Sequence, residues 1–228
     1  MPCRIAPLVN AQEPLFPRLR WLGPLWLAIY VPSYALAYGW SNFLFLCNLG
    51  VVITAIALWR GSRAWLSAAA LAAMPIGIVW AVDFFVGIAT GELPFGFTAY
   101  MWEARYPLFT RALSLYHLGW PILLVALLRK IGYDRRGWRL QSAVALVVLP
   151  ASRLLTAPEE NVNFVFRAPF FDRQLGPPAL HLAIVAAATC FGLYGLTHLA
   201  LARWLGAGAA VETAPASIAL APEPEVEG

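Results

Sequence analysis

Six apolar segments, separated by polar stretches, cover most of the chain. Each approaches the roughly 20 residues that an α-helix needs to cross a bilayer. The segments span residues 21–39, 42–59, 64–90, 107–128, 138–157 and 179–204. This pattern predicts an all-α polytopic membrane protein, in which residues 21–205 form a bundle of six transmembrane helices.

The composition identifies lipid as the solvent of this bundle. Of the 228 residues, 61% are hydrophobic and only 12% are charged, whereas soluble domains carry about 25% charged residues. The net charge of +4 is small, and the basic residues lie mostly in short loops rather than in a tract that would contact nucleic acid. We therefore expect the protein to contact the lipid bilayer and not nucleic acid.

Polar stretches flank the bundle at both ends. Residues 1–20 are rich in proline and arginine and predict a cytoplasmic N-terminal tail, while residues 206–228 have the Ala/Pro/Glu-rich composition of a disordered cytoplasmic tail. An alternative interpretation makes residues 1–37 a cleaved secretory signal, because arginines precede the first apolar run and small residues end it. Pro24 and Pro32 interrupt that run and favour a retained helix.

The distribution of basic residues predicts the orientation of the bundle. With the N-terminus in the cytoplasm, most basic residues fall on the cytoplasmic side, in agreement with the positive-inside rule. The cytoplasmic set is Arg4, Arg18, Arg20, Arg60, Arg63, Arg129, Lys130, Arg135, Arg136, Arg139 and Arg203. The outer set is Arg105, Arg111, Arg153, Arg167 and Arg173. We therefore predict that both termini are cytoplasmic.

Two outer loops, residues 91–106 and 158–178, are longer than simple turns. Loops of this length are often functional lids or binding segments, and both are rich in aromatic residues. They therefore have two interpretations, either as surfaces for a membrane-protein partner or as aromatic segments at the lipid headgroups.

One predicted helix carries a polar stripe within an apolar segment. Arg111, Ser114, His117 and Pro121 follow one another at spacings of three or four residues, which places them on one face of an α-helix. Ionisable groups inside a membrane are costly and by default mark functional sites. The stripe therefore predicts a site on the fourth helix.

Residues of other helices are expected at the same depth, in the outer half of the bundle. We expect three of these polar residues to be catalytic, namely His117, Asp83 and Ser114. The expected substrate-binding residues are Asn48, Arg111, Arg153 and His181. Within this layer His117 and Asp83 form the best acid/base pair, because a carboxylate can orient an imidazole and favour its charged form.

The same residues also fit a purely structural role. Asp83 would then pair with Arg111 or Arg153, and His117 would form a hydrogen bond between helices. His181 fits an interfacial position at a helix start, and Asn48 fits an interhelical hydrogen bond. The sequence leaves the functional and the structural interpretation open.

The sequence contains no motif for a metal or cofactor. Cys3, Cys47 and Cys190 are widely spaced without a CxxC pair. There is no phosphate-binding glycine loop, no GxSxG and no HExxH. We expect neither a metal ion nor a cofactor.

Several stretches resemble a family of uncharacterised bacterial multi-pass membrane proteins. They include the segments around Tyr100-Met-Trp, Leu113-Ser-Leu-Tyr-His117 and Ile131-Gly-Tyr-Asp-Arg-Arg136, together with Asn42–Asn48 and Asn161–Phe166. The resemblance implies a protein of the bacterial cytoplasmic (inner) membrane and brings no assigned activity.

The second and fourth helices also resemble the androgen-induced/FAR-17a family of six-helix intramembrane lipid hydrolases. The resemblance covers residues 43–49 and the run from His117 to Pro121, and it implies that His117 is the catalytic histidine. That family uses a threonine nucleophile in the second helix, whereas this sequence reads Leu44-Phe45-Leu46-Cys47 there. Cys47 is the substitute nucleophile that the resemblance would require.

Three functions remain in competition. The first is an enzyme or binding protein for a lipid or other amphipathic substrate, with His117 as base and Arg111 or Arg153 holding an anionic headgroup. The second is a proton-coupled transporter or small-solute channel that uses Asp83 and His117 as a relay. The third is a non-catalytic assembly subunit that binds a partner through its outer loops.

Overall fold

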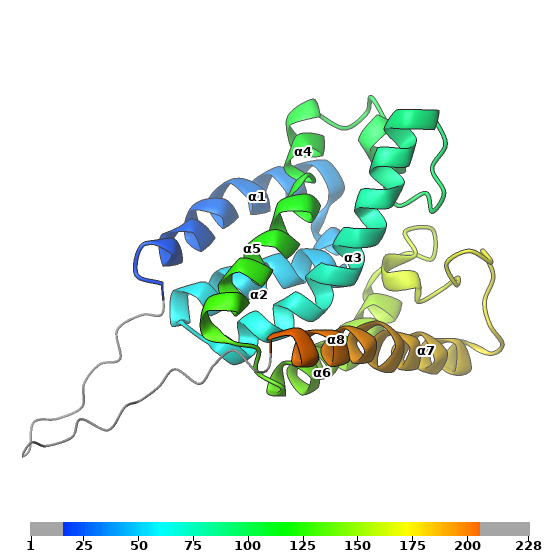
Figure 1. Ribbon diagram of the computed structural model, residues 1–228. Helices are drawn as coiled ribbons and strands as arrows, with labels where there is room; N and C mark the ends of the chain where they lie inside the picture. Colours follow the sequence, from blue (N-terminus) through cyan, green and yellow to red (C-terminus); the bar gives the residue numbers. More distant parts are fainter. Residues whose placement is uncertain (1–15, 206–228) are drawn as a thin grey trace, which may run out of the picture.

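The computed structural model describes residues 16–205, and every regular element in that range is helical (Figure 1). The main helices are α1 (Leu22–Tyr38), α2 (Leu46–Arg60), α3 (Arg63–Thr90), α4 (Leu108–Leu113), α5 (Tyr116–Ile131), α6 (Arg136–Leu155), α7 (Pro178–Ala187) and α8 (Tyr194–Leu205). The shorter elements are the 3₁₀-helices η1 (Leu19–Trp21), η2 (Trp40–Leu44), η3 (Ala99–Trp102) and η4 (Val162–Phe164), and the π-helix η5 (Ala188–Leu193). Most of the predicted N-terminal tail and the whole predicted C-terminal tail lie outside the described residues.

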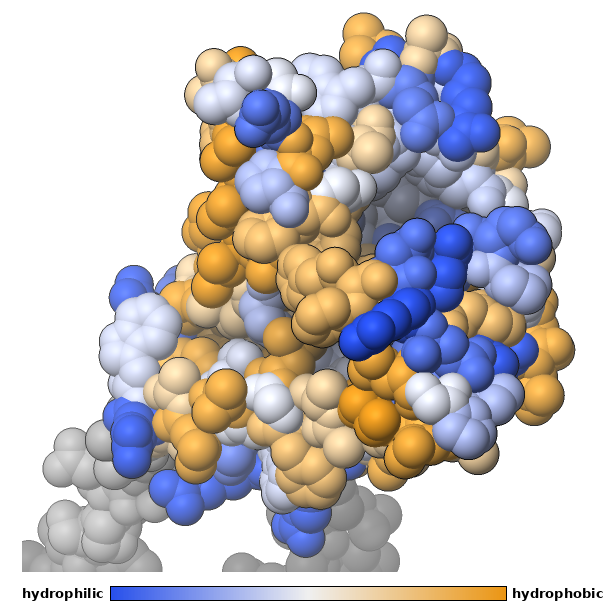
Figure 2. All heavy atoms as spheres, turned by 90° about the vertical axis from the view of Figure 1, so that its right-hand side faces the viewer, coloured by the Kyte–Doolittle hydropathy of each residue, from blue (hydrophilic) through white to orange (hydrophobic). Residues whose placement is uncertain are grey.

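Three helical stretches are long and apolar enough to cross a membrane. They are Arg63–Thr90, Leu108–Ile131 and Pro178–Leu205, and the apolar helix Leu46–Arg60 is shorter. Large apolar side chains also lie on the surface, and Leu36 is 89% exposed. Figure 2 shows broad apolar areas on one face, with hydrophilic residues gathered around a hollow. The described part of the chain is therefore all-helical, and its long apolar helices are those of a membrane protein.

The fourth predicted segment is divided into α4 and α5. Around the division the backbone hydrogen bonds join residues three apart, from Ser114 N to the Arg111 carbonyl (3.0 Å) and from His117 N to the Ser114 carbonyl (3.1 Å). Pro121 has no N–H to bond the His117 carbonyl one turn earlier. The predicted segment is therefore interrupted by a tighter turn at Ser114, in which residues three apart, such as Arg111, Ser114 and His117, remain aligned on one side.

The predicted cytoplasmic segments gather at one end of the molecule, which we call the basic end (residues 16–21, 57–65, 128–139 and 203–205). There Arg20 lies over the Trp59 ring (5.3 Å), and Arg129 lies over the Trp204 ring (4.8 Å). The Tyr133 backbone N–H also donates to the Leu205 carbonyl. Figure 1 shows the ends of the described chain on the side away from the two long loops.

The predicted outer segments gather at the other end, which we call the long-loop end (residues 38–46, 91–113 and 156–178). The two long loops touch through Phe97 and Phe164, whose rings are 5.4 Å apart. The second of these loops is joined to η2, because the Asn163 side chain donates to the Leu44 carbonyl and accepts from the Leu46 backbone N–H. The structure thus separates the two sets of loops that the charge pattern distinguishes.

Helix α3 lies at the centre of the packing, because small residues allow close approach. Residues 68–73 of this helix are buried. A Cβ at Gly137 of α6 would lie 2.8 Å from the Ser67 Cβ of α3, and a Cβ at Gly77 would lie 2.8 Å from the His117 carbonyl oxygen of α5. Small residues at helix interfaces are typical of membrane proteins, where packing rather than water drives association.

Candidate functional site

A group of tyrosines on α1 forms the frame of the candidate site. Tyr30, Tyr34 and Tyr38 are spaced by four residues, so they share one face of the helix. Their rings are in contact, at 4.2 Å between Tyr30 and Tyr34 and 5.0 Å between Tyr34 and Tyr38. The face carries phenol hydroxyls from the middle of the molecule to the long-loop end.

The deepest of these hydroxyls meets Asn48 of α2. The Asn48 Oδ1 atom accepts from the Tyr30 hydroxyl (2.8 Å) and from the Tyr116 hydroxyl of α5 (2.7 Å), and its side-chain N–H donates to the Asn42 carbonyl. The Asn48 side chain is buried. Both the amide oxygen and the amide nitrogen therefore have protein partners, and this residue joins α1, α2 and α5.

Nearer the long-loop end, the hydroxyl of Ser114 lies among three tyrosines. It forms a 2.5 Å hydrogen bond with the Tyr34 hydroxyl, and Ser114 is fully buried. The Tyr100 hydroxyl accepts from the Trp80 indole N–H at 3.2 Å. Burial raises the pKa of the Tyr100 phenol, and contacts with Ser114 and Trp80 oppose that rise. Tyr100 therefore remains a neutral phenol at ordinary pH.

Two polar atoms beside Ser114 are buried and have no hydrogen-bond partner among residues 16–205. They are the Tyr38 hydroxyl and the Arg111 Nε atom. The Tyr38 ring contacts the Tyr34 ring at 5.0 Å, and Arg111 uses its Nη1 atom to donate to the Met101 carbonyl at 2.8 Å. We call Tyr34, Tyr38, Tyr100, Ser114 and Arg111 the tyrosine–serine cluster. Since buried polar groups are nearly always paired, the cluster has hydrogen-bonding capacity for a further group.

His117 lies next to this cluster in an aromatic stack. Its ring is 5.2 Å from the Trp80 ring and 4.0 Å from the Tyr116 ring, with small interplanar angles. Its Nδ1 atom lies 2.9 Å from the Ser114 carbonyl oxygen, which can only accept. The Nδ1–H form of the imidazole therefore fits this position.

Asp83 has a different role from the one expected for it. Its carboxylate accepts from the backbone N–H groups of Phe95 (2.8 Å), Gly96 (3.1 Å) and Thr98 (2.7 Å), and from the Thr98 hydroxyl (2.8 Å). Among the described residues no hydrogen bond or salt bridge joins Asp83 to His117, Arg111 or Arg153. The described part of the structure therefore contains neither the expected pair of Asp83 with His117 nor a pair of Asp83 with an arginine. The loop after α3 uses the carboxylate as its hydrogen-bond acceptor instead.

The other two expected substrate-binding residues lie at the second long loop. Arg153 donates from Nη1 to the Val165 carbonyl at 2.6 Å and lies 4.4 Å from the Phe166 ring. It also lines a cavity of about 450 Å³ whose other walls are Pro158, Glu159, Phe166, Arg167 and Gln174. The cavity places two guanidinium groups beside one carboxylate.

His181 is fully buried and belongs to the loop rather than to an open interface. Its Nε2 atom lies 2.9 Å from the Phe164 carbonyl oxygen, and its Nδ1 atom accepts from the Leu175 backbone N–H at 3.1 Å. The carbonyl requires a donor and the N–H requires an acceptor, so the ring carries its proton on Nε2. His181 thus joins two separate parts of the second long loop, at Phe164 and at Leu175.

The expected polar layer therefore consists of separate local groups. Ser114 and Arg111 share the tyrosine–serine cluster, and His117 borders it. Asp83 serves the first long loop, while Arg153 and His181 serve the second. Tyr34, Tyr38 and Tyr100 are the members of the cluster that the choice of polar candidates missed. The four-residue spacing of Tyr34 and Tyr38 in an apolar segment marks a common face.

Within residues 16–205, no three histidine, cysteine, aspartate or glutamate side chains form a group that could hold a metal ion. Comparisons with protein-family models, with curated proteins and with solved structures find no match to this chain. We therefore infer the function from the geometry of the site.

Proposed function

We propose that the protein is a multi-pass protein of the bacterial inner membrane whose tyrosine–serine cluster binds the polar group of a lipid or other amphipathic ligand. In this proposal six helical segments cross the bilayer, both termini are cytoplasmic and the long-loop end faces outward. The charge pattern supports this orientation, because the basic and the long-loop segments lie at opposite ends.

The observation that carries the proposal is the pair of buried, unpartnered atoms, the Tyr38 hydroxyl and Arg111 Nε. An unsatisfied polar group in hydrocarbon costs several kcal/mol, so a bound group that fills these positions would be strongly favoured. A hydroxyl donor and a guanidinium N–H match the oxygens of a phosphate or carboxylate headgroup. The surrounding tyrosine rings suit the apolar part of such a molecule.

The geometry favours binding over catalysis by these residues. A nucleophile and its base must lie within hydrogen-bonding reach of each other. The Ser114 hydroxyl instead pairs with Tyr34, and the His117 Nδ1 atom lies at the Ser114 backbone carbonyl. Cys47, the substitute nucleophile, has its Sγ atom 3.8 Å from Asn48 Oδ1, and no described contact joins it to His117.

A transporter is the second candidate, and one observation supports it. At the opposite end of the bundle, Gln141 Oε1 and Ser142 Oγ are also buried without partners in the described range. The Gln141 amide donates to the Tyr194 hydroxyl (3.3 Å), next to the π-helix η5, and π-helical turns are frequent at functional sites. A carrier would use this inner group as well as the outer cluster.

The test is ligand retention by the Tyr38→Phe variant. The substitution removes one oxygen that has no hydrogen bond in the protein, so the melting temperature should change little. Retention of the co-purified lipid or amphipathic molecule, measured by native mass spectrometry of the full chain in mild detergent, should fall about tenfold, the effect of one lost hydrogen bond to a charged group.

Tyr133→Phe is the matched control, because Tyr133 lies at the basic end and bonds His198 instead. It should leave retention unchanged. Equal retention by the wild type and Tyr38→Phe would contradict ligand binding at the cluster. Loss of retention in Tyr194→Phe as well as in Tyr38→Phe would favour the transporter.

A further inference from the structure

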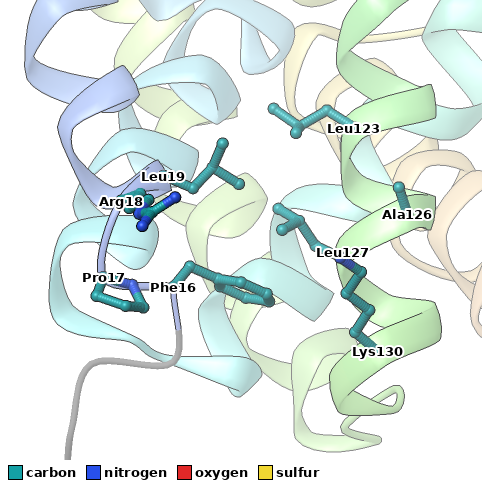
Figure 3. A pocket seen from close by; sticks show the side chains of 8 residues that line it. All are labelled: Phe16, Pro17, Arg18, Leu19, Leu123, Ala126, Leu127 and Lys130. Atoms are coloured by element: carbon teal, nitrogen blue, oxygen red, sulfur yellow. The ribbon is translucent and has the colours of Figure 1, made fainter.

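A second cavity lies at the basic end, far from the tyrosine–serine cluster. It has a volume of about 410 Å³ and is lined by Phe16, Pro17, Arg18, Leu19, Leu123, Ala126, Leu127 and Lys130. Figure 3 shows Phe16 and Leu19 pointing toward Leu123 and Leu127 of α5 across an open space. We call this cavity the basic groove.

The walls of the basic groove follow from the helical repeat of α5. Leu123, Ala126, Leu127 and Lys130 are separated by three, one and three residues, so they form one face of that helix. Three of them are apolar, and Lys130 stands at the end of the face. The opposite wall repeats this arrangement, because Phe16 and Leu19 are apolar and Arg18 is charged.

The charges of the basic groove are of one sign. Its lining contains Arg18 and Lys130 and no acidic residue. Within residues 16–205 neither cation forms a salt bridge. The neighbouring cations Arg20 and Arg129 instead lie over tryptophan rings. An apolar channel with two cations at its rim complements a molecule that has an apolar chain and an anionic headgroup.

We propose that the basic groove binds an anionic phospholipid, with an acyl chain between residues 16–19 and α5 and its phosphate between Arg18 and Lys130. Basic pockets beside transmembrane helices are known to bind anionic headgroups. The site is distinct from the cluster at the long-loop end. The proposed topology is needed only to assign the leaflet of the bound lipid, which would be the cytoplasmic leaflet.

The test compares retention of phosphatidylglycerol and phosphatidylcholine by the purified full chain, using native mass spectrometry. The wild type should retain the anionic lipid in preference to the zwitterionic one. The double variant Arg18→Gln/Lys130→Gln should lose this preference by roughly thirtyfold, since each cation near a membrane surface contributes about a fivefold effect. Ala126→Trp, which fills the groove without changing its charge, should also remove the preference.

The control is Arg129→Gln/Arg203→Gln, because it removes two charges at the same end from residues that do not line the groove. An equal loss of preference in this control would contradict the proposal by showing a general charge effect. A preference retained in Ala126→Trp would contradict it as well. The Tyr38→Phe variant distinguishes the basic groove from the tyrosine–serine cluster. It should still retain phosphatidylglycerol in preference to phosphatidylcholine, because Tyr38 does not line the groove.

Discussion

Replacing Asp83 with alanine should destabilise the protein by at least about 3 kcal/mol, because three backbone N–H groups and one hydroxyl lose their common acceptor. Asp83 and Thr98 are both fully buried, so water cannot replace the lost bonds at Thr98 without entering the protein. The melting temperature in detergent should fall by roughly 6–12 °C. Thermal unfolding followed by circular dichroism measures this change.

Asp83→Asn should also destabilise the protein, because its NH₂ group would face N–H donors. The exposed Asp172, whose side chain is 82% accessible, is the matched control. Asp172→Asn should change the free energy of unfolding by less than about 0.5 kcal/mol. An Asp83→Asn variant that melts like the wild type but no longer retains its ligand would show that Asp83 belongs to the site and not to the loop.

Replacing Gly77 with alanine should separate α3 from α5. The new Cβ would lie 2.8 Å from the His117 carbonyl oxygen and closer still to the Pro121 ring. Neither group can rotate away, since one is backbone and the other is a ring within a helix. We expect a loss of about 2–3 kcal/mol, at the upper end for overpacking.

Gly119→Ala provides the control on α5, because a Cβ there meets no atom within 4 Å. It should be neutral or stabilise the protein by up to about 1 kcal/mol through helix propensity. Melting temperatures of both variants, measured in the same detergent, give the comparison. Similar melting temperatures for the two variants would mean that α3 and α5 do not pack closely at Gly77.

The positions of the helices were predictable from hydrophobic length alone. The predicted segment 64–90 corresponds to α3 (Arg63–Thr90), and the segment 138–157 to α6 (Arg136–Leu155). Apolar runs predict helices well, because a segment in lipid must form all its backbone hydrogen bonds within itself. The division at Ser114 was not predictable, since it depends on how α4 and α5 pack against α1 and α3.

The candidate site was predictable only in part. Ser114 and Arg111 lie in one cluster, and the sequence shows this because residues three positions apart are neighbours on one face of a helix. The role of Asp83 could not be predicted, because its partners are backbone N–H groups of a loop, which the sequence does not display. The partners of His181 are backbone groups for the same reason.

The proposed topology determines which leaflet of the membrane each of the two binding sites faces. Labelling of single cysteines in intact bacterial cells tests it, using Ala104→Cys at the long-loop end and Arg60→Cys at the basic end, both exposed positions. The background is a chain in which Cys3, Cys47 and Cys190 are replaced by alanine. A membrane-impermeant maleimide added outside should label Ala104→Cys at once and Arg60→Cys only after the cells are permeabilised. Labelling of Arg60→Cys in intact cells, with Ala104→Cys protected, would contradict the account, because the tyrosine–serine cluster would then face the cytoplasm.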